Sequence, residues 1–274
     1  LPSILAKQLQ KGIGDYIETT FPMTNEPFKG SVEKMLANKG SVYHEPYVAV
    51  RLPFRVAEEM STCFEAIHPA YLPYVHQQKA FERLTGDDGR STLVATGTGS
   101  GKTECFLYPI LEYCYRHRGE RGIKALIIYP MNALATDQAK RIAELIYGSD
   151  ELRGNVTVGM YVGGQEHTPA RTMSEHGVIT DHETMLNNAP DILMTNYKML
   201  DYLLVRPKDA LLWQDNEPET LKYIAVDELH TFDGAQGTDL ACLLRRLKRR
   251  LGIYDGYLCC VGTSATMGSK ENNG

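Results

Sequence analysis

The sequence has few features of zinc-binding, secreted or membrane proteins. Its six cysteines include no C-x-x-C pair, which argues against a zinc site. No apolar run approaches the ~20 residues that a membrane-spanning helix needs. The N-terminal stretch LPSILAKQLQKGIGDY is too polar for the core of a secretory signal peptide. These absences predict a cytoplasmic protein with reduced cysteines, no zinc and no membrane partner. The cysteines expected inside apolar elements are Cys105, Cys242, Cys259 and Cys260.

An excess of positive charge is also missing, because the net charge is −5 at pH 7. Bulk electrostatics therefore gives no indication of nucleic-acid binding. It does not exclude such binding, since helix N-termini and backbone amides can hold phosphates without adding formal charge. A short basic run interleaved with leucines comprises Arg245, Arg246, Lys248, Arg249 and Arg250. The favoured interpretation is the solvated face of an amphipathic helix, and the alternative is a contact with nucleic acid or a partner.

Short apolar runs alternate with segments of helical periodicity over most of the chain. The expected strands are residues 93–95, 124–129, 156–161, 191–195, 222–227 and 258–263, and the clearest expected helices are 71–84, 132–147 and 237–251. This alternation predicts an α/β fold with a parallel sheet and helices on both faces. Polar residues 165–188 show no clear period, so we expect a surface excursion there.

The first part of the chain has a different character. Residues 1–66 are predicted to form a small accessory segment, and residues 67–274 the main domain. Gly12 and Gly14 are expected to interrupt the loosely helical spacing at the N-terminus. Residues 31–38 predict a short helix, and PYVAVRLPF predicts one extended segment bounded by prolines.

A glycine-rich loop between an apolar strand and a helix is the strongest chemical signal. Residues 91–103 are STLVATGTGSGKT. The glycines tolerate positive φ, so backbone N–H groups can curl around a phosphate, and the following helix adds its positive N-terminal end. Lys102 would reach the β- and γ-phosphates, and the Thr103 hydroxyl would ligate Mg²⁺. The loop therefore predicts a site for ATP and Mg²⁺.

The whole loop is assigned to the nucleotide. Its predicted cofactor-binding residues are Thr96, Gly97, Thr98, Gly99, Ser100, Gly101, Lys102 and Thr103. Thr96 departs from the usual pattern, which begins with glycine, although helicase-type loops accept small residues there. Upstream, Gln77 could pair with N6 and N7 of adenine, because its amide carries a donor and an acceptor. Tyr71 or Tyr74 could stack on the base, and a solvated glutamine at a helix start is an equal alternative.

Two adjacent carboxylates follow another apolar strand. Asp227 is expected to hold the metal, largely through water, and Glu228 to orient and deprotonate the attacking water. With Lys102 they form the predicted catalytic set. His230 is expected to relay the state of the nucleotide to its neighbours, although a lone histidine is more often structural.

The motifs TGTGSGKT, YPMNALATDQ, YVGG, ILMTNYKML, VDELH and GTSAT occur in that order. Together they resemble the first RecA-like motor domain of superfamily 2 DExH helicases, over roughly residues 70–268. VDELHTFDGAQGTDLACLLRRLKRR and PYVAVRLPF are similar to large bacterial Hrq/YprA-like repair and phage-defence helicases. The resemblance implies a three-layer RecA-like P-loop domain with a mainly parallel sheet, and nucleic acid as a partner.

The resemblance also assigns residues beyond the ATP site. Those matching nucleic-acid contacts are Met131, Asn132, Gly163, Gly164, Thr195 and Asn196. Such motifs contact the backbone of a strand and not its sequence. Ser264 and Thr266 match the motif that couples hydrolysis to movement, through hydrogen bonds towards His230 and Asp227. Each of these residues, taken singly, would suit a turn or a helix cap equally well.

Motors of this kind use two RecA-like domains, and no second domain follows Thr266 in this sequence. We therefore expect a fragment or split half that binds nucleotide weakly, hydrolyses it poorly and works with a second domain in cis or in trans. The implied function is the ATP-binding half of a 3′-to-5′ helicase or translocase on single-stranded DNA, in repair or phage defence. The alternatives are a nucleotide-dependent binding or scaffold module without turnover, and an RNA helicase.

Overall fold

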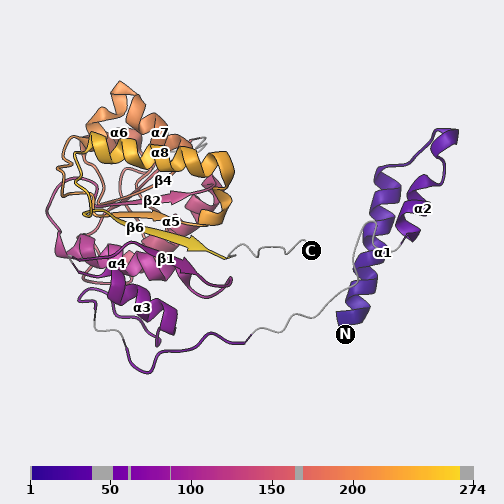
Figure 1. The fold of residues 1–274 in the computed structure, drawn as a ribbon, viewed down its shortest axis with the longest axis horizontal. Coiled ribbons are helices and arrows are strands. Elements are labelled where there is room, and N and C mark those ends of the chain that lie inside the picture. The colour runs from indigo at the N-terminus through magenta and orange to yellow at the C-terminus, as the bar shows by residue number, and fades with distance from the viewer. Residues whose placement is uncertain (1, 39–51, 61–62, 87, 164–168, 266–274) are drawn as a thin grey trace. The chain divides into compact units, whose positions relative to one another are not determined.

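The computed structural model describes residues 2–38, 52–60, 63–86, 88–163 and 169–265. The chain divides into two compact units, Leu1–Pro53 and Phe54–Gly274 (Figure 1). In the first unit, helices α1 (Pro2–Thr20) and α2 (Ser31–Ala37) are separated by the short 3₁₀ segment η1 (Glu26–Phe28). Helix α1 continues through both of its glycines, so the expected interruption is wrong. Most of the predicted extended segment PYVAVRLPF lies outside the described residues.

The second unit is built on a six-stranded parallel sheet in the order β1-β6-β5-β2-β4-β3. The strands are β1 (Thr92–Ala95), β2 (Ala125–Tyr129), β3 (Val158–Tyr161), β4 (Ile192–Asn196), β5 (Tyr223–Val226) and β6 (Cys259–Ser264). Each lies within one or two residues of an expected strand. The predicted parallel α/β sheet is therefore confirmed.

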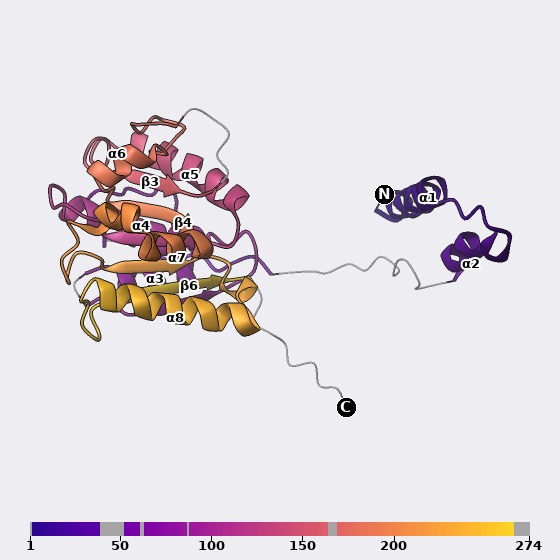
Figure 2. The same cartoon turned by 90° about the horizontal axis from the view of Figure 1, so that it is seen from above.

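Helices cover both faces of this sheet. One face carries α3 (Val75–Leu84), α4 (Lys102–Arg116) and α5 (Asn132–Tyr147), and the other α6 (His182–Asn187), α7 (Tyr197–Val205) and α8 (Gly234–Arg250). Two 3₁₀ segments, η2 (Pro207–Trp213) and η3 (Leu229–Thr231), complete the described elements. Figure 1 shows the sheet between these layers, and Figure 2 shows the same cartoon from above, with α7 and α8 in front of the strands. This is the expected three-layer RecA-like architecture.

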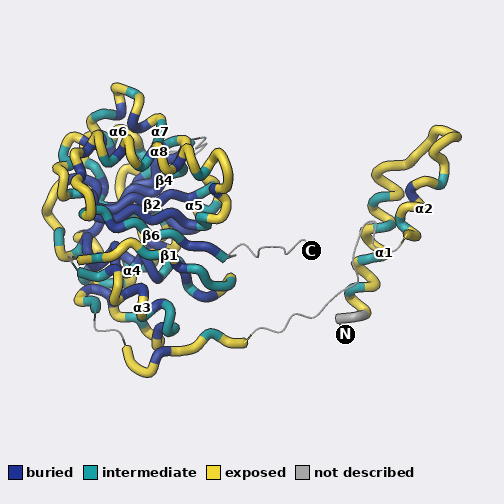
Figure 3. The backbone as a smooth tube through the Cα atoms, in the orientation of Figure 1, coloured by how far each residue is buried: buried dark blue, intermediate teal, exposed yellow. Residues whose placement is uncertain are grey.

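Strand β2 lies at the centre of the core. All of its side chains are buried, and they alternate between the two hydrophobic clusters on either side of the sheet. Ala125, Ile127 and Tyr129 face the α4 and α5 side, whereas Leu126 and Ile128 face the α7 and α8 side. Figure 3 shows the central strands as the most continuously buried part of the tube.

Residues 169–188 are not a simple surface excursion, so that expectation is wrong for the described part. Ile179 pairs with the β3 backbone, its N–H donating to Val158 and its carbonyl accepting from Met160. Helix α6 follows, capped by the Asp181 carboxylate, and its Met185 is fully buried. A long-range strand contact thus orders a segment that has no local period.

Two smaller differences concern burial. Cys242 is exposed on α8, so it is not the interior cysteine expected from the sequence. Ala66 and Ile67 belong to the core cluster of the second unit, and Phe64 packs against it. The end of the predicted accessory segment therefore packs with the main unit, and the domain assignment stays a prediction. Among the described residues, no helix combines the length and apolar character needed to span a bilayer.

Candidate functional site

The carboxyl ends of the parallel strands meet at one edge of the sheet, and the predicted site residues lie there. The loop after β1 joins this edge through the Thr96 N–H, which donates to the Ser264 carbonyl at the end of β6 (3.2 Å). Asp227 follows β5, and Asn196 ends β4. Ligands of open parallel sheets bind at such an edge.

The phosphate loop curls around the Lys102 side chain. Gly99 and Gly101 have φ angles of +77° and +70°, which glycine adopts without strain, and α4 begins at the next residue. The Lys102 ammonium donates to the carbonyls of Thr96 (3.2 Å) and Gly97 (3.3 Å). The loop thus fixes a positive charge at the N-terminus of a helix, the arrangement that suits a nucleotide phosphate.

Two residues at the start of α3 hold the loop from outside. His76 Nε2 donates to the Ser100 carbonyl (2.8 Å), and Gln77 Nε2 donates to the Gly101 carbonyl (3.1 Å). A Cβ on Gly101 would displace the Gln77 amide from this position, and the φ angle of +70° itself favours glycine. The Thr96 hydroxyl lies 2.6 Å from that of Ser100, so the threonine that departs from the usual pattern braces the loop.

The Gln77 amide is bonded on both sides within the protein, since its Oε1 also accepts from the Tyr74 N–H (2.8 Å). Adenine recognition by Gln77 would exchange these bonds, and it stays a prediction. A hollow of about 440 Å³ lies beside the amide. Its lining includes Tyr71 and Tyr74, the residues considered for stacking, and Tyr108 of α4.

Asp227 is buried and held in a fixed orientation. Its carboxylate Oδ1 accepts from the Thr263 hydroxyl and from the Glu228 N–H (3.1 Å), and its own N–H donates to the Ile128 carbonyl (3.0 Å). Within the described part of the chain, no three potential ligands cluster as a self-sufficient metal site. The donor set fits Mg²⁺ held by Asp227 and Thr103 together with phosphate oxygens and water.

Glu228 has φ +50° and ψ +47°, and it is the one non-glycine residue with positive φ among the described residues. This left-handed backbone turns the side chain away from the strand direction. Its carboxylate lies 3.3 Å from His230 Nδ1, which is 3.4 Å from the Ser264 hydroxyl. The structure thus brings together the predicted base, relay and coupling residues. Thr266 lies outside the described residues.

A hollow of about 370 Å³ lies farther along the same edge and joins three predicted nucleic-acid motifs. Asn132 Nδ2 donates to the Gly163 carbonyl (2.9 Å), and Asn196 Nδ2 donates to Asn132 Oδ1 (2.7 Å). Asn196 Oδ1 in turn caps α7 by accepting from the Met199 N–H (2.8 Å). We call this hollow the asparagine pocket, defined by Asn132, Gly163 and Asn196.

The remaining predicted nucleic-acid residues differ in position. Met131 is 59% exposed at the start of α5. Thr195 is fully buried, and its hydroxyl donates to the Tyr161 carbonyl (2.7 Å), so in this structure it supports β3 and does not line the pocket. Gly164 lies outside the described residues.

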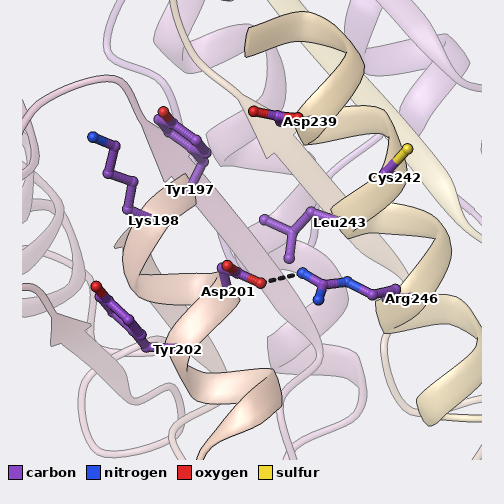
Figure 4. A pocket seen from close by; sticks show the side chains of 8 residues that line it. All are labelled: Tyr197, Lys198, Asp201, Tyr202, Asp239, Cys242, Leu243 and Arg246. Atoms are coloured by element: carbon purple, nitrogen blue, oxygen red, sulfur yellow. Dashed lines mark hydrogen bonds and ion pairs between the residues drawn. The ribbon is translucent and has the colours of Figure 1, made fainter. Parts of the chain in front are cut away.

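A third hollow, of about 530 Å³, runs between α7 and α8 (Figure 4). It shares Tyr197, Lys198 and Tyr202 with the asparagine pocket. An ion pair between Asp201 of α7 and Arg246 of α8 crosses it. No sequence motif predicted this groove, and its signal in the sequence is Tyr197, directly after ILMTN, with Tyr202 five residues later.

Much of the basic run on α8 is engaged within the protein. Besides the Arg246 ion pair, Lys248 pairs with Asp255 (2.8 Å), and an Arg250 guanidinium nitrogen donates to the Leu204 carbonyl (2.6 Å). These bonds favour a structural, solvated face over a nucleic-acid contact.

Comparison with known proteins agrees with this geometry. Residues 74–273 match the DEAD/DEAH box helicase family. The chain is 26% identical to the Druantia protein DruE of Escherichia coli, over 97% of this chain and 20% of that protein. It is 32% identical to the uncharacterized ATP-dependent helicase YprA of Bacillus subtilis, over 73% of this chain and 24% of that protein. Among solved structures it is similar to the DUF1998 helicase MrfA bound to DNA and AMPPNP, with a TM-score of 0.56 and 30% identity over 80% of this chain and 28% of that one. The chain thus spans about a fifth to a quarter of these curated relatives.

Proposed function

The chain belongs to the DEAD/DEAH box helicase family, and we propose that it is the ATP-binding half of a motor that moves along single-stranded DNA. The observation that carries this proposal is the shared sheet edge. Lys102 and Asp227 lie at one end of it, and the asparagine pocket lies at the other. To couple ATP hydrolysis to movement, a motor needs at least a nucleotide site and a site for the nucleic-acid strand on one rigid sheet.

The nucleotide end supplies positioning and charge. Bound Mg²⁺–ATP would bring the reactive phosphoryl group, whose charge the metal and Lys102 neutralise. The loop amides and the α4 N-terminus would hold the phosphates, and Asp227 and Thr103 would hold the metal. Glu228 would orient the attacking water and take its proton, with His230 beside its carboxylate.

The asparagine pocket would supply contacts for the sugar-phosphate backbone of a nucleic-acid strand. Helices α5 and α7 both begin there, so N–H groups of their first turns would be available to a phosphate bound in the pocket. Asn132 and Asn196 add neutral amide donors, which agrees with a protein of net charge −5. The groove between α7 and α8 extends the pocket, and its tyrosines offer faces on which bases can stack.

The preference for DNA is supported by MrfA, whose structure contains DNA and AMPPNP. A 3′-to-5′ direction and a role in repair or phage defence follow the resemblance of the motifs alone. A second RecA-like domain, in cis or in trans, would complete the ATP site with arginine fingers. Such fingers are worth about 10³ to 10⁵ in rate in other phosphoryl-transfer enzymes.

The test is the ATPase rate with and without single-stranded DNA, RNA or duplex, measured on this chain and on the full-length protein that contains it. We expect stimulation by single-stranded DNA in the full-length protein and little turnover by the isolated chain. Lys102→Ala, which removes the charge at the centre of the loop, should abolish both nucleotide binding and stimulation.

The other outcomes distinguish the alternatives. Better stimulation by RNA would favour an RNA helicase. ATP binding without stimulated turnover in either protein would favour a binding or scaffold module. Strong strand separation by the isolated 274-residue chain would refute the motor-half proposal.

A further inference from the structure

A row of polar side chains crosses the carboxyl edge of the sheet on its α4 and α5 face. Thr263, Asp227, Tyr129 and Asn196 come from β6, the end of β5, β2 and β4. Ile128 pairs with Val226, and Tyr129 pairs with Asn196. Because strand side chains alternate, Tyr129 and Asp227 fall on the same face at neighbouring positions. Tyr129 therefore stands between the nucleotide site and the asparagine pocket.

The Tyr129 hydroxyl is the anomaly in this row. The residue is fully buried, and its oxygen has no hydrogen-bond partner among the described residues. A buried tyrosine normally finds such a partner, because an unmade bond to a buried polar group is costly. Burial and the negative charge of Asp227 hold the pKa of Tyr129 well above its usual value. A phenol hydroxyl ordinarily carries its proton at neutral pH, so it is available as a donor.

Two other tyrosines of the same sheet show the usual behaviour. Tyr223 on β5 is just as buried, and its hydroxyl donates to the Leu84 carbonyl. Tyr161 on β3 donates to Asp209 Oδ1 (3.2 Å). Core packing alone therefore does not explain a tyrosine hydroxyl at position 129, where phenylalanine would fill the same space.

We propose that Tyr129 is a positioning residue whose hydroxyl donates to the Asp227 carboxylate when Asp227 holds the metal of a bound nucleotide. Among the described residues, the two donors that reach Asp227, Thr263 and Glu228, both use Oδ1. A further donor would fix the carboxylate plane while the second oxygen serves the metal and its water. Since β2 also pairs with β4, Tyr129 would link Asp227 to the strand that carries Asn196. This inference rests on the proposed function of the nucleotide site.

The test compares Tyr129→Phe with the unmodified full-length protein by nucleotide titration, with Mg²⁺ and with EDTA, and by thermal melting without nucleotide. A hydrogen bond to a charged group supports a loss of about tenfold in affinity for Mg²⁺–nucleotide. The affinity in EDTA should stay within about twofold. The melting temperature should not fall, because the hydroxyl that is removed has no partner to lose among the residues that the structure describes.

Tyr223→Phe is the matched control, since it removes a buried hydroxyl that does have a partner. It should lower the melting temperature and leave the Mg²⁺ dependence unchanged. Unchanged Mg²⁺–nucleotide affinity in Tyr129→Phe would overturn the inference, and so would a lower melting temperature with equal losses in Mg²⁺ and in EDTA. If the unmodified protein bound no nucleotide at all, the proposed function itself would fall, and this inference with it.

Discussion

The functional side chains at the two ends of the sheet edge differ in their exposure to solvent. At the nucleotide end, Lys102 and Asp227 are only 9% and 5% exposed, and hydrogen bonds hold both. At the other end, the amides of Asn132 and Asn196 line an open pocket beside the exposed Met131. A compact, highly charged ligand is best held by fixed charges that are shielded from water. A polymer that slides needs accessible neutral donors, because these release each phosphate at little cost.

The largest expected effect separates chemistry from binding at the nucleotide end. Glu228→Gln should lower nucleic-acid-stimulated phosphate release by about 10² to 10⁴ in the full-length protein, because it removes the proposed general base. Nucleotide affinity should stay within about twofold, since the proposed site would hold phosphates and metal with other residues. Glu217→Gln, the same change at an exposed position, is the control. A stimulated rate near that of the unmodified protein would remove Glu228 from the catalytic role.

A smaller effect should be confined to the asparagine pocket. Asn196→Asp keeps an oxygen to cap α7, but it places a negative charge where a phosphate is expected. Single-stranded DNA affinity, measured by fluorescence anisotropy, should fall roughly tenfold at low salt, with a smaller loss as salt screens the repulsion.

Asn187→Asp, which adds the same charge at the exposed end of α6, should have little effect on DNA. Nucleotide affinity should be unchanged in both variants. Equal losses in the two variants would mean that overall charge matters and that the pocket does not.

The smallest expected effect is on cysteine labelling, with one cysteine at each end of the sheet edge as the probe. Burial raises the pKa of Cys105, in the first turn of α4, to about 12, so it stays a thiol at pH 8. Cys242 is exposed and lines the groove between α7 and α8. A maleimide should therefore label Cys242 and spare Cys105, as peptide mass spectrometry would show. Bound single-stranded DNA should slow labelling of Cys242. Labelling at an unchanged rate would place the strand elsewhere.

Local patterns in the sequence predicted much of this fold. The loop at residues 91–103 and the apolar run of β2 carry their own signals, in glycine spacing and in continuous hydrophobicity. The order of the motifs predicted that Lys102, Asp227 and Asn196 lie at or just after strand ends. The parallel sheet then follows, because alternating strands and helices allow few other arrangements.

Features that depend on distant contacts could not be predicted in this way. Residues 169–188 are ordered by pairing between Ile179 and β3, which leaves no period in the sequence. Thr263 directly precedes the predicted Ser264, yet its role depends on the place of Asp227 on the neighbouring strand. Tyr129 closes an apolar run and suggests an ordinary core residue, since only the fold reveals that its hydroxyl has no partner among the described residues.

The left-handed backbone of Glu228 has a consequence for how this protein can evolve. Side-chain crowding makes that conformation cost roughly 1–2 kcal/mol for an L-residue, a cost that glycine avoids. Selection for thermal stability alone would therefore drive position 228 towards glycine and lose the carboxylate proposed as the base. A glutamate that persists here against this pressure would be maintained by selection for activity.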